Sequence, residues 1–233
     1  MILDGCHSLS DALPFTLLPL LPRLQTLKVQ NCDYMKTIFD VKCTTQDTLV
    51  TFPLNELVLS ELPNLETVWN EDPHRILSMH NLQKVFVDRC KCLQRLFPAS
   101  VATDLEKLET LVVKDCAGLM TIVAEESEDQ DKEIIFQRLR VLDLTRLEKL
   151  RCFYADNLTL SFPSLEEVHV INCSSMKTFG EWYYEEYESP REESDLNSAV
   201  RRTSEEQVRT HTSTRLNSNC NISLSCFSYD NYV

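Results

Sequence analysis

The sequence predicts an α/β-type solenoid in which short parallel β-strands stack side by side. The stretch Leu108–Val123 carries its apolar residues in the order L-x-x-L-x-L-x-x-C-x-x-L-x-x-I. The apolar period is two around Leu111 and Val113, as in a short half-buried strand, and three afterwards, as in a turn that leads the chain back over its own core. A unit this short cannot bury its own apolar face, so it must stack on copies of itself.

Six copies of this pattern follow one another along the chain. Their first leucines are spaced 26 to 31 residues apart, close to the upper end of the roughly 20–29 residues of a leucine-rich repeat. These leucines are Leu24, Leu54, Leu82, Leu108, Leu139 and Leu165. The sequence therefore predicts a leucine-rich-repeat horseshoe with a short parallel β-sheet on its concave face and mostly irregular segments on its convex face.

The chain divides into three parts. Residues 1–12 match the second half of a repeat, so the chain starts inside a repeat, and we expect it to be the C-terminal piece of a longer protein or a truncated gene product. Residues 13–180 form the solenoid of six repeats. Its apolar run 13–22 is predicted to be the back of a coil rather than a signal peptide, because no basic region precedes it and it contains three prolines.

Residues 181–233 differ in composition from the repeats. The segment Trp182–Tyr187 could cover the last coil as a weak aromatic cap. Beyond about residue 190 the chain is acidic and polar, and it has too few large apolar residues to offset the entropy lost on ordering. We expect a disordered tail there.

Charge and glycine content exclude several functions. The net charge of −13 opposes nucleic acid and anionic membranes as partners, because binding to phosphate needs a basic face. Only three glycines occur, so no Gly-rich phosphate loop can be built. No apolar segment is long enough to span a membrane. We expect no cofactor.

Five of the ten cysteines fall at the ninth position of the repeat, the corner where each strand ends: Cys6, Cys32, Cys90, Cys116 and Cys173. Free cysteine behaves as a small buried hydrophobe with a weak donor, so these thiols can help to satisfy backbone groups at the corner. We expect a reduced, cytosolic set, with a disulfide or metal role as the alternative. The chain has no C-x-x-C pair, and Cys90 and Cys92 have the wrong spacing for a zinc knuckle.

The candidate site lies on the concave face, where alternate residues of each strand point outward. Val58, Phe86 and Val112 occupy the central outward position of consecutive strands and should form an apolar stripe about 10 Å long. Charged residues ring this stripe: Glu56, Lys84, Asp88 and Lys114. An apolar patch with a charged rim is typical of a surface that binds a protein partner.

Two other interpretations of this stripe stay open. Valine and phenylalanine are ordinary strand-forming residues, or another domain of the parent protein covers them. His169 lies on the same face beside Glu167, but Cys173 points inward by parity and no serine or cysteine nucleophile lies beside the histidine. The chain is therefore expected not to be an enzyme.

With the repeats laid out, the sequence resembles the C-terminal leucine-rich-repeat region of plant coiled-coil nucleotide-binding disease-resistance receptors. The resemblance covers about residues 1–180 and is carried by phrases such as FPLNELVLSELPNLETVW, LEKLETLVVKDCAGLMTIV and FPSLEEVHVINCSSMKTF. It implies a cytoplasmic module that senses a pathogen effector or a guarded host protein and makes autoinhibitory contacts with the nucleotide-binding domain of the parent receptor. The phosphate loop of that upstream domain has no match here.

A different kind of leucine-rich-repeat protein is the alternative. An adaptor such as a substrate-recruiting subunit of a ubiquitin ligase would use the same stack of coils. The coding sequence upstream of Met1 separates the two, because a receptor predicts a nucleotide-binding domain there and an adaptor predicts an F-box.

Overall fold

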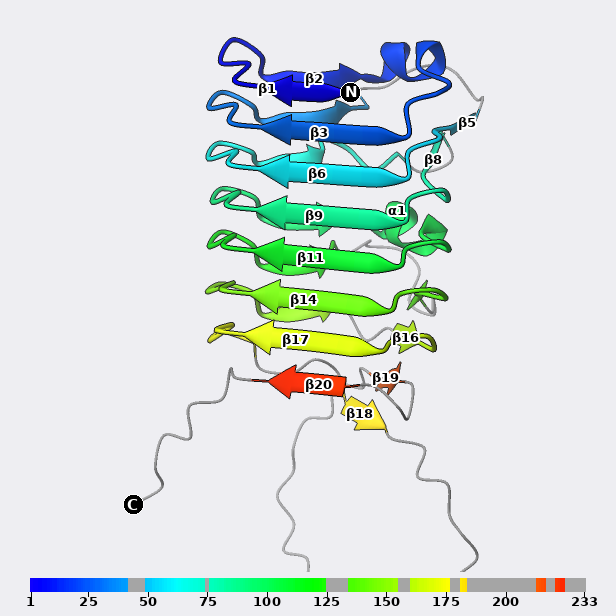
Figure 1. Cartoon of the computed structure of the whole chain (residues 1–233), viewed down its shortest axis with the longest axis vertical. Helices are drawn as coiled ribbons and strands as arrows, with labels where there is room; N and C mark the ends of the chain where they lie inside the picture. The colour runs from blue at the N-terminus through cyan, green and yellow to red at the C-terminus, as the bar shows by residue number, and fades with distance from the viewer. Residues whose placement is uncertain are drawn as a thin grey trace, which may run out of the picture.

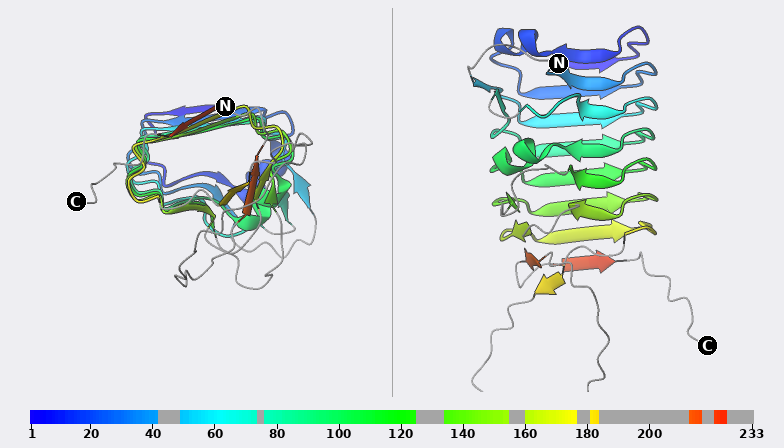
Figure 2. Two further views of the ribbon diagram at one scale, coloured as in Figure 1. Left: turned by 90° about the horizontal axis from the view of Figure 1, so that it is seen from below. Right: turned by 180° about the vertical axis from the view of Figure 1, so that it is seen from behind.

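The computed structural model describes residues 1–41, 49–73, 76–124, 134–154 and 160–176, together with the backbones of three strands at 181–183, 213–216 and 221–224. The chain winds into a parallel β-solenoid, with one coil stacked on the next from the N-terminal end downward (Figure 1). Seen along its axis, two parallel sheets form opposite walls of the solenoid (Figure 2). Buried apolar side chains fill the space between them. The predicted solenoid is confirmed.

The larger wall is an eight-stranded sheet that receives one strand from each successive coil. Its strands, in spatial order, are β1 (Ile2–Asp4), β3 (Thr26–Gln30), β6 (Glu56–Ser60), β9 (Lys84–Asp88), β11 (Thr110–Lys114), β14 (Val141–Thr145), β17 (Glu167–Ile171) and β20 (Asn221–Leu224). All neighbours pair in parallel. The strands lie in chain order because each coil brings the chain back to this sheet one strand further along the stack.

The predicted register of these strands is confirmed. Leu111 and Val113 of β11 are completely buried, whereas Val112 between them is half-buried on the outer side of the sheet. The same alternation holds in β6, where Leu57 and Leu59 point inward. Because side chains alternate with a period of two, the inward leucine and valine pairs fix which residues of each strand face outward.

A tight turn in the left-handed conformation ends each strand of this sheet. The residue that follows the strand has a φ of 54° to 62° in every coil: Gly5, Asn31, Glu61, Arg89, Asp115, Arg146 and Asn172. Its N–H donates to the last carbonyl of the neighbouring strand, for example from Asn31 to Ser60 at 3.1 Å and from Arg146 to Ile171 at 2.7 Å. This hydrogen bond compensates the strain of a positive φ at non-glycine residues.

The cysteine at the next position supports the same turn. The thiol of Cys32 donates to the carbonyl of Gln30 at 3.1 Å, and the thiol of Cys116 donates to the carbonyl of Lys114 at 3.1 Å. The predicted role of these thiols at the strand ends is confirmed. Among the described residues, Cys6, Cys32, Cys90, Cys92 and Cys116 are free thiols.

The opposite wall contains regular strands where the apolar step of three predicted only a tight turn. It contains a six-stranded parallel sheet of short strands: β2 (Asp11–Pro14), β4 (Thr37–Asp40), β7 (Thr67–Trp69), β10 (Arg95–Phe97), β12 (Thr121–Val123) and β15 (Cys152–Tyr154). Most of these strands consist of β-branched and aromatic residues, which suit a pleated surface. The sequence did not predict these strands because consecutive residues of each segment are buried, so the apolar residues do not alternate with polar ones.

The remaining elements connect the two walls. They are the 3₁₀ helix η1 (Phe15–Leu20), the helix α1 (Ala99–Asp104), the paired strands β5 (Val50–Thr51) and β8 (Leu77–Ser78), and a sheet of β13 (Ile134–Ile135), β16 (Leu160–Phe162), β19 (Ser213–Leu216) and β18 (Glu181–Tyr183). The apolar run 13–22 therefore forms the back of a coil, as predicted. Stacked aromatic rings fill this side of the core, such as Phe136 and Phe162 at 5.4 Å between ring centres.

The tail beyond residue 190 was predicted to be disordered, and most of it lies outside the described residues. The structure differs from this expectation at two short strands. Strand β20 pairs with β17 so that Ile222 lies opposite Val168 and Leu224 opposite Val170. The alternation of Ile222 and Leu224 matches the strand pattern of the repeats, which explains why this segment continues the sheet. The side chains of the predicted aromatic cap lie outside the described residues.

One glycine is required by close packing between coils. A Cβ atom on Gly118 would overlap the carbonyl oxygen of Lys91 and would lie 3.2 Å from the carbonyl oxygen of Leu93. The turn of one coil therefore rests directly on the backbone of the preceding coil at this position.

The register predicts unequal effects at neighbouring positions of β11. Replacing Leu111 with alanine should lower the free energy of unfolding by about 2–5 kcal/mol, because it leaves a cavity between coils. The control Val112→Ala should cost at most about 1 kcal/mol, because that side chain faces outward. Urea denaturation followed by circular dichroism measures both, and equal losses would contradict the register.

The close approach at Gly118 predicts that Gly118→Ala destabilises the solenoid by about 1–3 kcal/mol, because the backbone of Lys91 must shift. Ser175 occupies the equivalent position two coils later and is exposed. The control Ser175→Ala should therefore change the free energy of unfolding by no more than about 0.5 kcal/mol. A thermal melt of the two variants that shows no difference would argue against the predicted overlap.

Candidate interaction surface

The outer side of the eight-stranded sheet, here called the strand face, presents one continuous apolar stripe. Strands β6, β9 and β11 place Val58 opposite Phe86 and Phe86 opposite Val112. All three side chains are half-buried, so each shows part of its surface to solvent. Parallel strands lie roughly 4.8 Å apart, which makes the stripe about 10 Å long. These three residues are called the apolar stripe below.

Charged residues flank the apolar stripe on both sides, as the sequence predicted. Glu56 lies opposite Lys84 at the start of the strands, and Asp88 lies opposite Lys114 at their ends. Lys84 is exposed, and the other three are partly exposed. The side chain of Asp88 accepts a hydrogen bond from Arg89 Nε at 2.9 Å. The structure therefore brings these four predicted residues together around the stripe.

Asp143 ends the apolar stripe on its C-terminal side, and sequence reasoning did not single it out. It lies opposite Val112, and one of its carboxylate oxygens is 2.7 Å from Lys114 Nζ. The hydroxyl of Thr145 donates to the other oxygen. The Asp143 side chain is only 15% exposed, so its charge is held by these two donors. Lys114 and Asp143 are not directly opposite each other but lie diagonally across β11 and β14, so the ion pair can be identified only once the register of the two strands is known.

His169 lies on the strand face but not at the stripe. It is opposite Asp143, which separates it from Val112. Its Nε2 atom lies 3.8 Å from Glu167 Oε2, and both side chains are well exposed. A partner that covered the stripe would need to extend across two further strands to reach His169. Its role at the surface stays a prediction.

A ladder of alternating charges runs along the turns that end the strands. Arg89 forms an ion pair with Glu61 at 2.9 Å, and Arg146 donates two hydrogen bonds to the carboxylate of Asp115, one of them at 2.5 Å. These residues occupy the left-handed turn position of consecutive coils. The hydrogen bonds from Arg146 lower the pKa of Asp115 from its ordinary value of 3.8. The ladder ties neighbouring turns together at the edge of the strand face.

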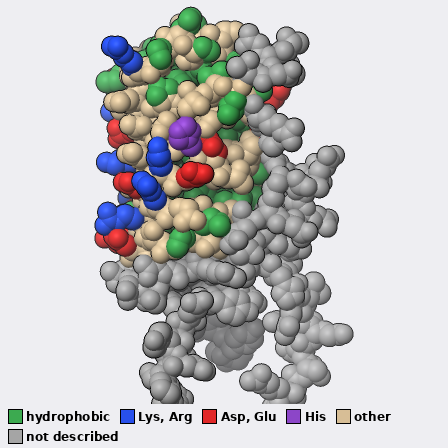
Figure 3. Space-filling model, turned by 90° about the vertical axis from the view of Figure 1, so that its right-hand side faces the viewer, with side chains coloured by type: hydrophobic (Ala, Val, Ile, Leu, Met, Phe, Trp, Pro, Cys, Tyr) green, Lys and Arg blue, Asp and Glu red, His purple; other side chains and the backbone are tan. Residues whose placement is uncertain are grey.

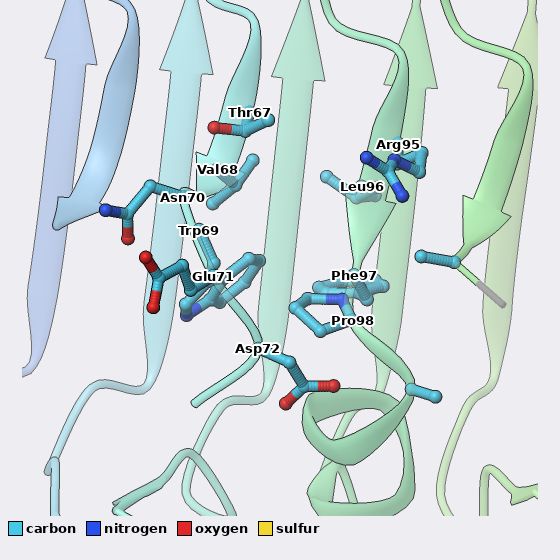
Figure 4. A pocket seen from close by; sticks show the side chains of 12 residues that line it. Thr67, Val68, Trp69, Asn70, Glu71, Asp72, Arg95, Leu96, Phe97 and Pro98 are labelled. Carbon is cyan, nitrogen blue, oxygen red and sulfur yellow. The ribbon is translucent and has the colours of Figure 1, made fainter. Parts of the chain in front are cut away.

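A cleft of about 300 Å³ lies on the opposite wall, between β7 and β10 (Figure 4). Trp69 and Phe97 form its apolar side, and Asp72, which accepts a hydrogen bond from Ser100, lies at its end beside α1. The indole N–H of Trp69 is buried and has no hydrogen-bond partner within the described part of the chain. The residues that line the cleft do not include a nucleophile hydrogen-bonded to a base.

A serine, a histidine and an aspartate meet beside α1, but their arrangement does not suit catalysis. The hydroxyl of Ser78 donates to Asp104 Oδ2 at 2.9 Å and lies 2.9 Å from His80 Nδ1. The single hydroxyl hydrogen of Ser78 is used in the hydrogen bond to Asp104. His80 Nδ1 must therefore donate to the Ser78 oxygen and cannot act as its base. Ser78 is also only 8% exposed. The backbone N–H of Met79 donates to the same carboxylate, so the cluster holds α1 against β8.

The described residues contain no cluster of three or more histidine, cysteine, aspartate or glutamate side chains that could hold a metal ion. Within the same described ranges, no helix has the length and apolar character needed to cross a membrane. Figure 3 shows one lateral side of the solenoid, where basic and acidic side chains lie side by side among hydrophobic ones. That side therefore shows no basic face of the kind that binds phosphate backbones.

The lowered pKa of Asp115 predicts a pH-dependent contribution to stability. Its carboxylate is charged in both states above about pH 5, where the pair with Arg146 contributes fully, and the contribution is lost as the pH falls through the lowered pKa of the folded state. Asp115→Asn should therefore cost up to about 1 kcal/mol at pH 7 and almost nothing at about pH 2. Arg146→Gln should show the same pH dependence in urea denaturation, and a loss at pH 7 that persists in acid would contradict the ion pair.

Comparison with known proteins agrees with this architecture. The family model of the leucine-rich repeats of plant disease resistance proteins like RPS2 matches residues 1–117, which is half of the chain. A protein of Arabidopsis thaliana, At4g10780, named as a disease resistance protein, is 29% identical over 143 residues, which cover 59% of this chain and 16% of that protein. No solved structure matches the chain. The repeats, their register and the family match together place this chain in the RPS2-like leucine-rich-repeat family of plant disease resistance proteins.

Proposed function

We propose that this chain is the protein-recognition module of an intracellular plant immune receptor. In this proposal it senses a pathogen effector or a guarded host protein, and it contacts the nucleotide-binding domain of the parent receptor to hold that receptor inactive. It works by binding alone and catalyses no reaction. The family match supports the receptor context, and the chain corresponds to only 16% of the length of its relative from Arabidopsis.

The observation that carries the proposal is the apolar stripe with its charged rim. An isolated valine or phenylalanine on a sheet needs no explanation, but Val58, Phe86 and Val112 are contiguous across three strands. Lys84 and Glu56 on one flank and Lys114 with Asp143 on the other surround them with both signs of charge. A partner gains burial energy from the stripe and specificity from the rim.

The size of this surface has a consequence for regulation. A stripe of three side chains can be covered by one partner at a time. If the nucleotide-binding domain and the sensed protein both use it, binding of one must displace the other. The free energy of exchanging one partner for the other then equals the difference between their two binding free energies.

The cytoplasmic location in this proposal is supported by the state of the cysteines. The described thiols at the strand ends act as hydrogen-bond donors to backbone carbonyls. They can do so only in the reduced form, which reducing compartments maintain.

The test of this function is the substitution Phe86→Asp. A buried charge at the centre of the stripe should weaken binding of the purified chain to the purified nucleotide-binding domain of its receptor by at least roughly tenfold, because that contact would leave the carboxylate desolvated. Isothermal titration calorimetry measures the affinity, and circular dichroism verifies that the fold is kept. Phe86 faces outward, so the solenoid should stay folded.

Tyr34→Asp provides the matched control. Tyr34 is an aromatic residue that is 65% exposed on a turn away from the stripe. Its replacement by aspartate makes the same change of charge and should leave the affinity unchanged. Equal affinities of Phe86→Asp and the unmodified chain would remove the strand face from the proposed mechanism.

A further inference from the structure

The cysteines at the ninth repeat position, here called the cysteine ladder, lie on adjacent coils at two places. Cys6 neighbours Cys32, and Cys90 neighbours Cys116, whereas the intervening coils carry Leu62 and Leu147 at this position. The sequence predicts a reduced set of thiols here, with a disulfide or metal role as the alternative. Two adjacent thiols have a chemistry that a single buried thiol lacks, because each can reach the sulfur of the other.

The geometry of the first pair places Cys6 and Cys32 side by side on neighbouring coils. Strands β1 and β3 pair with an offset of 26 residues, from Ile2 opposite Lys28 to Asp4 opposite Gln30, and the same offset relates Cys6 to Cys32. Neighbouring parallel strands are roughly 4.8 Å apart, within the range of about 4.4–6.8 Å between Cα atoms of a disulfide. The sulfur of Cys32 points toward the first coil, since it accepts a hydrogen bond from the backbone N–H of Cys6 at 3.3 Å.

The surroundings of the two pairs differ. Cys6 is partly exposed, whereas Cys32, Cys90 and Cys116 are completely buried. Because Cys6 is the partly exposed member of the pair, its sulfur is the one that meets a dissolved oxidant first. The pair of Cys90 and Cys116 has the same place in the repeat but no access to solvent. The buried pair therefore serves as an internal control for the effect of exposure on oxidation.

The turn can lose a thiol donor without leaving a backbone group unsatisfied. The carbonyl of Gln30 accepts from the Cys32 thiol at 3.1 Å, and it also accepts from the backbone N–H of Gly5 at 3.1 Å. When the thiol proton is removed, the second bond remains. The Cys6 thiol donates to the carbonyl of Asp4 at 3.8 Å, and this contact is exposed, so water can replace it. Forming a disulfide here therefore leaves neither carbonyl buried without a donor.

We propose that Cys6 and Cys32 form an oxidative modification site, at which hydrogen peroxide converts the two thiols to a disulfide between the first two coils. In the first step the Cys6 thiolate attacks one oxygen of hydrogen peroxide, the O–O bond breaks, and Cys6 becomes a sulfenic acid. The hydroxide that leaves takes up the proton lost by the Cys6 thiol and becomes water. In the second step the Cys32 sulfur attacks the Cys6 sulfur, the S–O bond breaks, and a second water leaves with the proton of Cys32. The thiols lose two electrons and two protons, and the peroxide is reduced to two waters.

The consequence is a covalent link at the end of the strand face. Strand β1 pairs with β3, so the disulfide would join two neighbouring strands of the main sheet. A disulfide from Cys6 to Cys32 closes a loop of one full coil, from residue 6 to residue 32, and restricts the unfolded chain. The oxidised chain should therefore melt at a higher temperature than the reduced chain.

The experiment uses the full chain in which serine replaces the five cysteines that lie outside the ninth repeat position: Cys43, Cys92, Cys152, Cys220 and Cys226. The reduced protein is treated with hydrogen peroxide under native conditions. The remaining thiols are then alkylated in denaturant, and tryptic peptides are identified by mass spectrometry. We expect a loss of two alkylatable thiols and a cross-linked peptide that contains Cys6 and Cys32, reversed by dithiothreitol, with Cys90 and Cys116 still fully alkylated.

Two variants separate this pair from general oxidation. Cys6→Ser should retain all of its remaining thiols after the same treatment and should show no rise in melting temperature. Cys90→Ser should still form the link between Cys6 and Cys32. The proposal is overturned if Cys6 and Cys32 both remain alkylatable in the folded parent protein, if Cys6 is oxidised without a cross-link, or if Cys90 and Cys116 are linked at the same rate.

Discussion

The structure depends on one constraint, the hydrogen-bonded register between equivalent residues of successive coils. In the strands from β1 to β17 of the main sheet, residues 26 to 31 positions apart in the chain pair side by side, as Leu27 does with Leu57 and Leu111 with Leu142. A slip of one residue in any pair would turn its inward leucines outward and its outward residues inward. The core and the strand face are therefore set by the same hydrogen bonds and cannot vary independently.

The strand-end turns show how this register tolerates a varied sequence. Each turn needs a left-handed residue, yet only Gly5 is a glycine there, and residues such as Glu61 and Arg89 adopt the conformation at some cost. Hydrogen bonds to the next coil compensate that strain at the six turns from Gly5 to Arg146. The polar turn residues then pair with one another along the stack, from Arg89 to Glu61 and from Arg146 to Asp115. The left-handed residues, the ion pairs and the buried thiols thus all lie in the turn that ends each strand of the main sheet.

A scaffold of this kind suits recognition better than chemistry. Its outward residues lie on a sheet surface, where their spacing is fixed and where a stripe such as Val58, Phe86 and Val112 can meet a partner. The groups that could have suggested catalysis have structural partners instead, as Ser78 has in Asp104. The family of plant disease resistance proteins uses such repeats, and the chain shares its repeat pattern over residues 1–117.

The sequence by itself determined the repeat, the inward and outward residues of each main strand, the cysteines at the corner and the members of the apolar stripe, because all of these follow from the local alternation of side chains. Only the tertiary structure decided the second sheet around Trp69 and Phe97, the ion pair from Lys114 to Asp143, and the return of residues 221–224 to the main sheet. These features join coils of unequal length. Their partners lie far apart in the chain and come together only when every coil has been stacked in register.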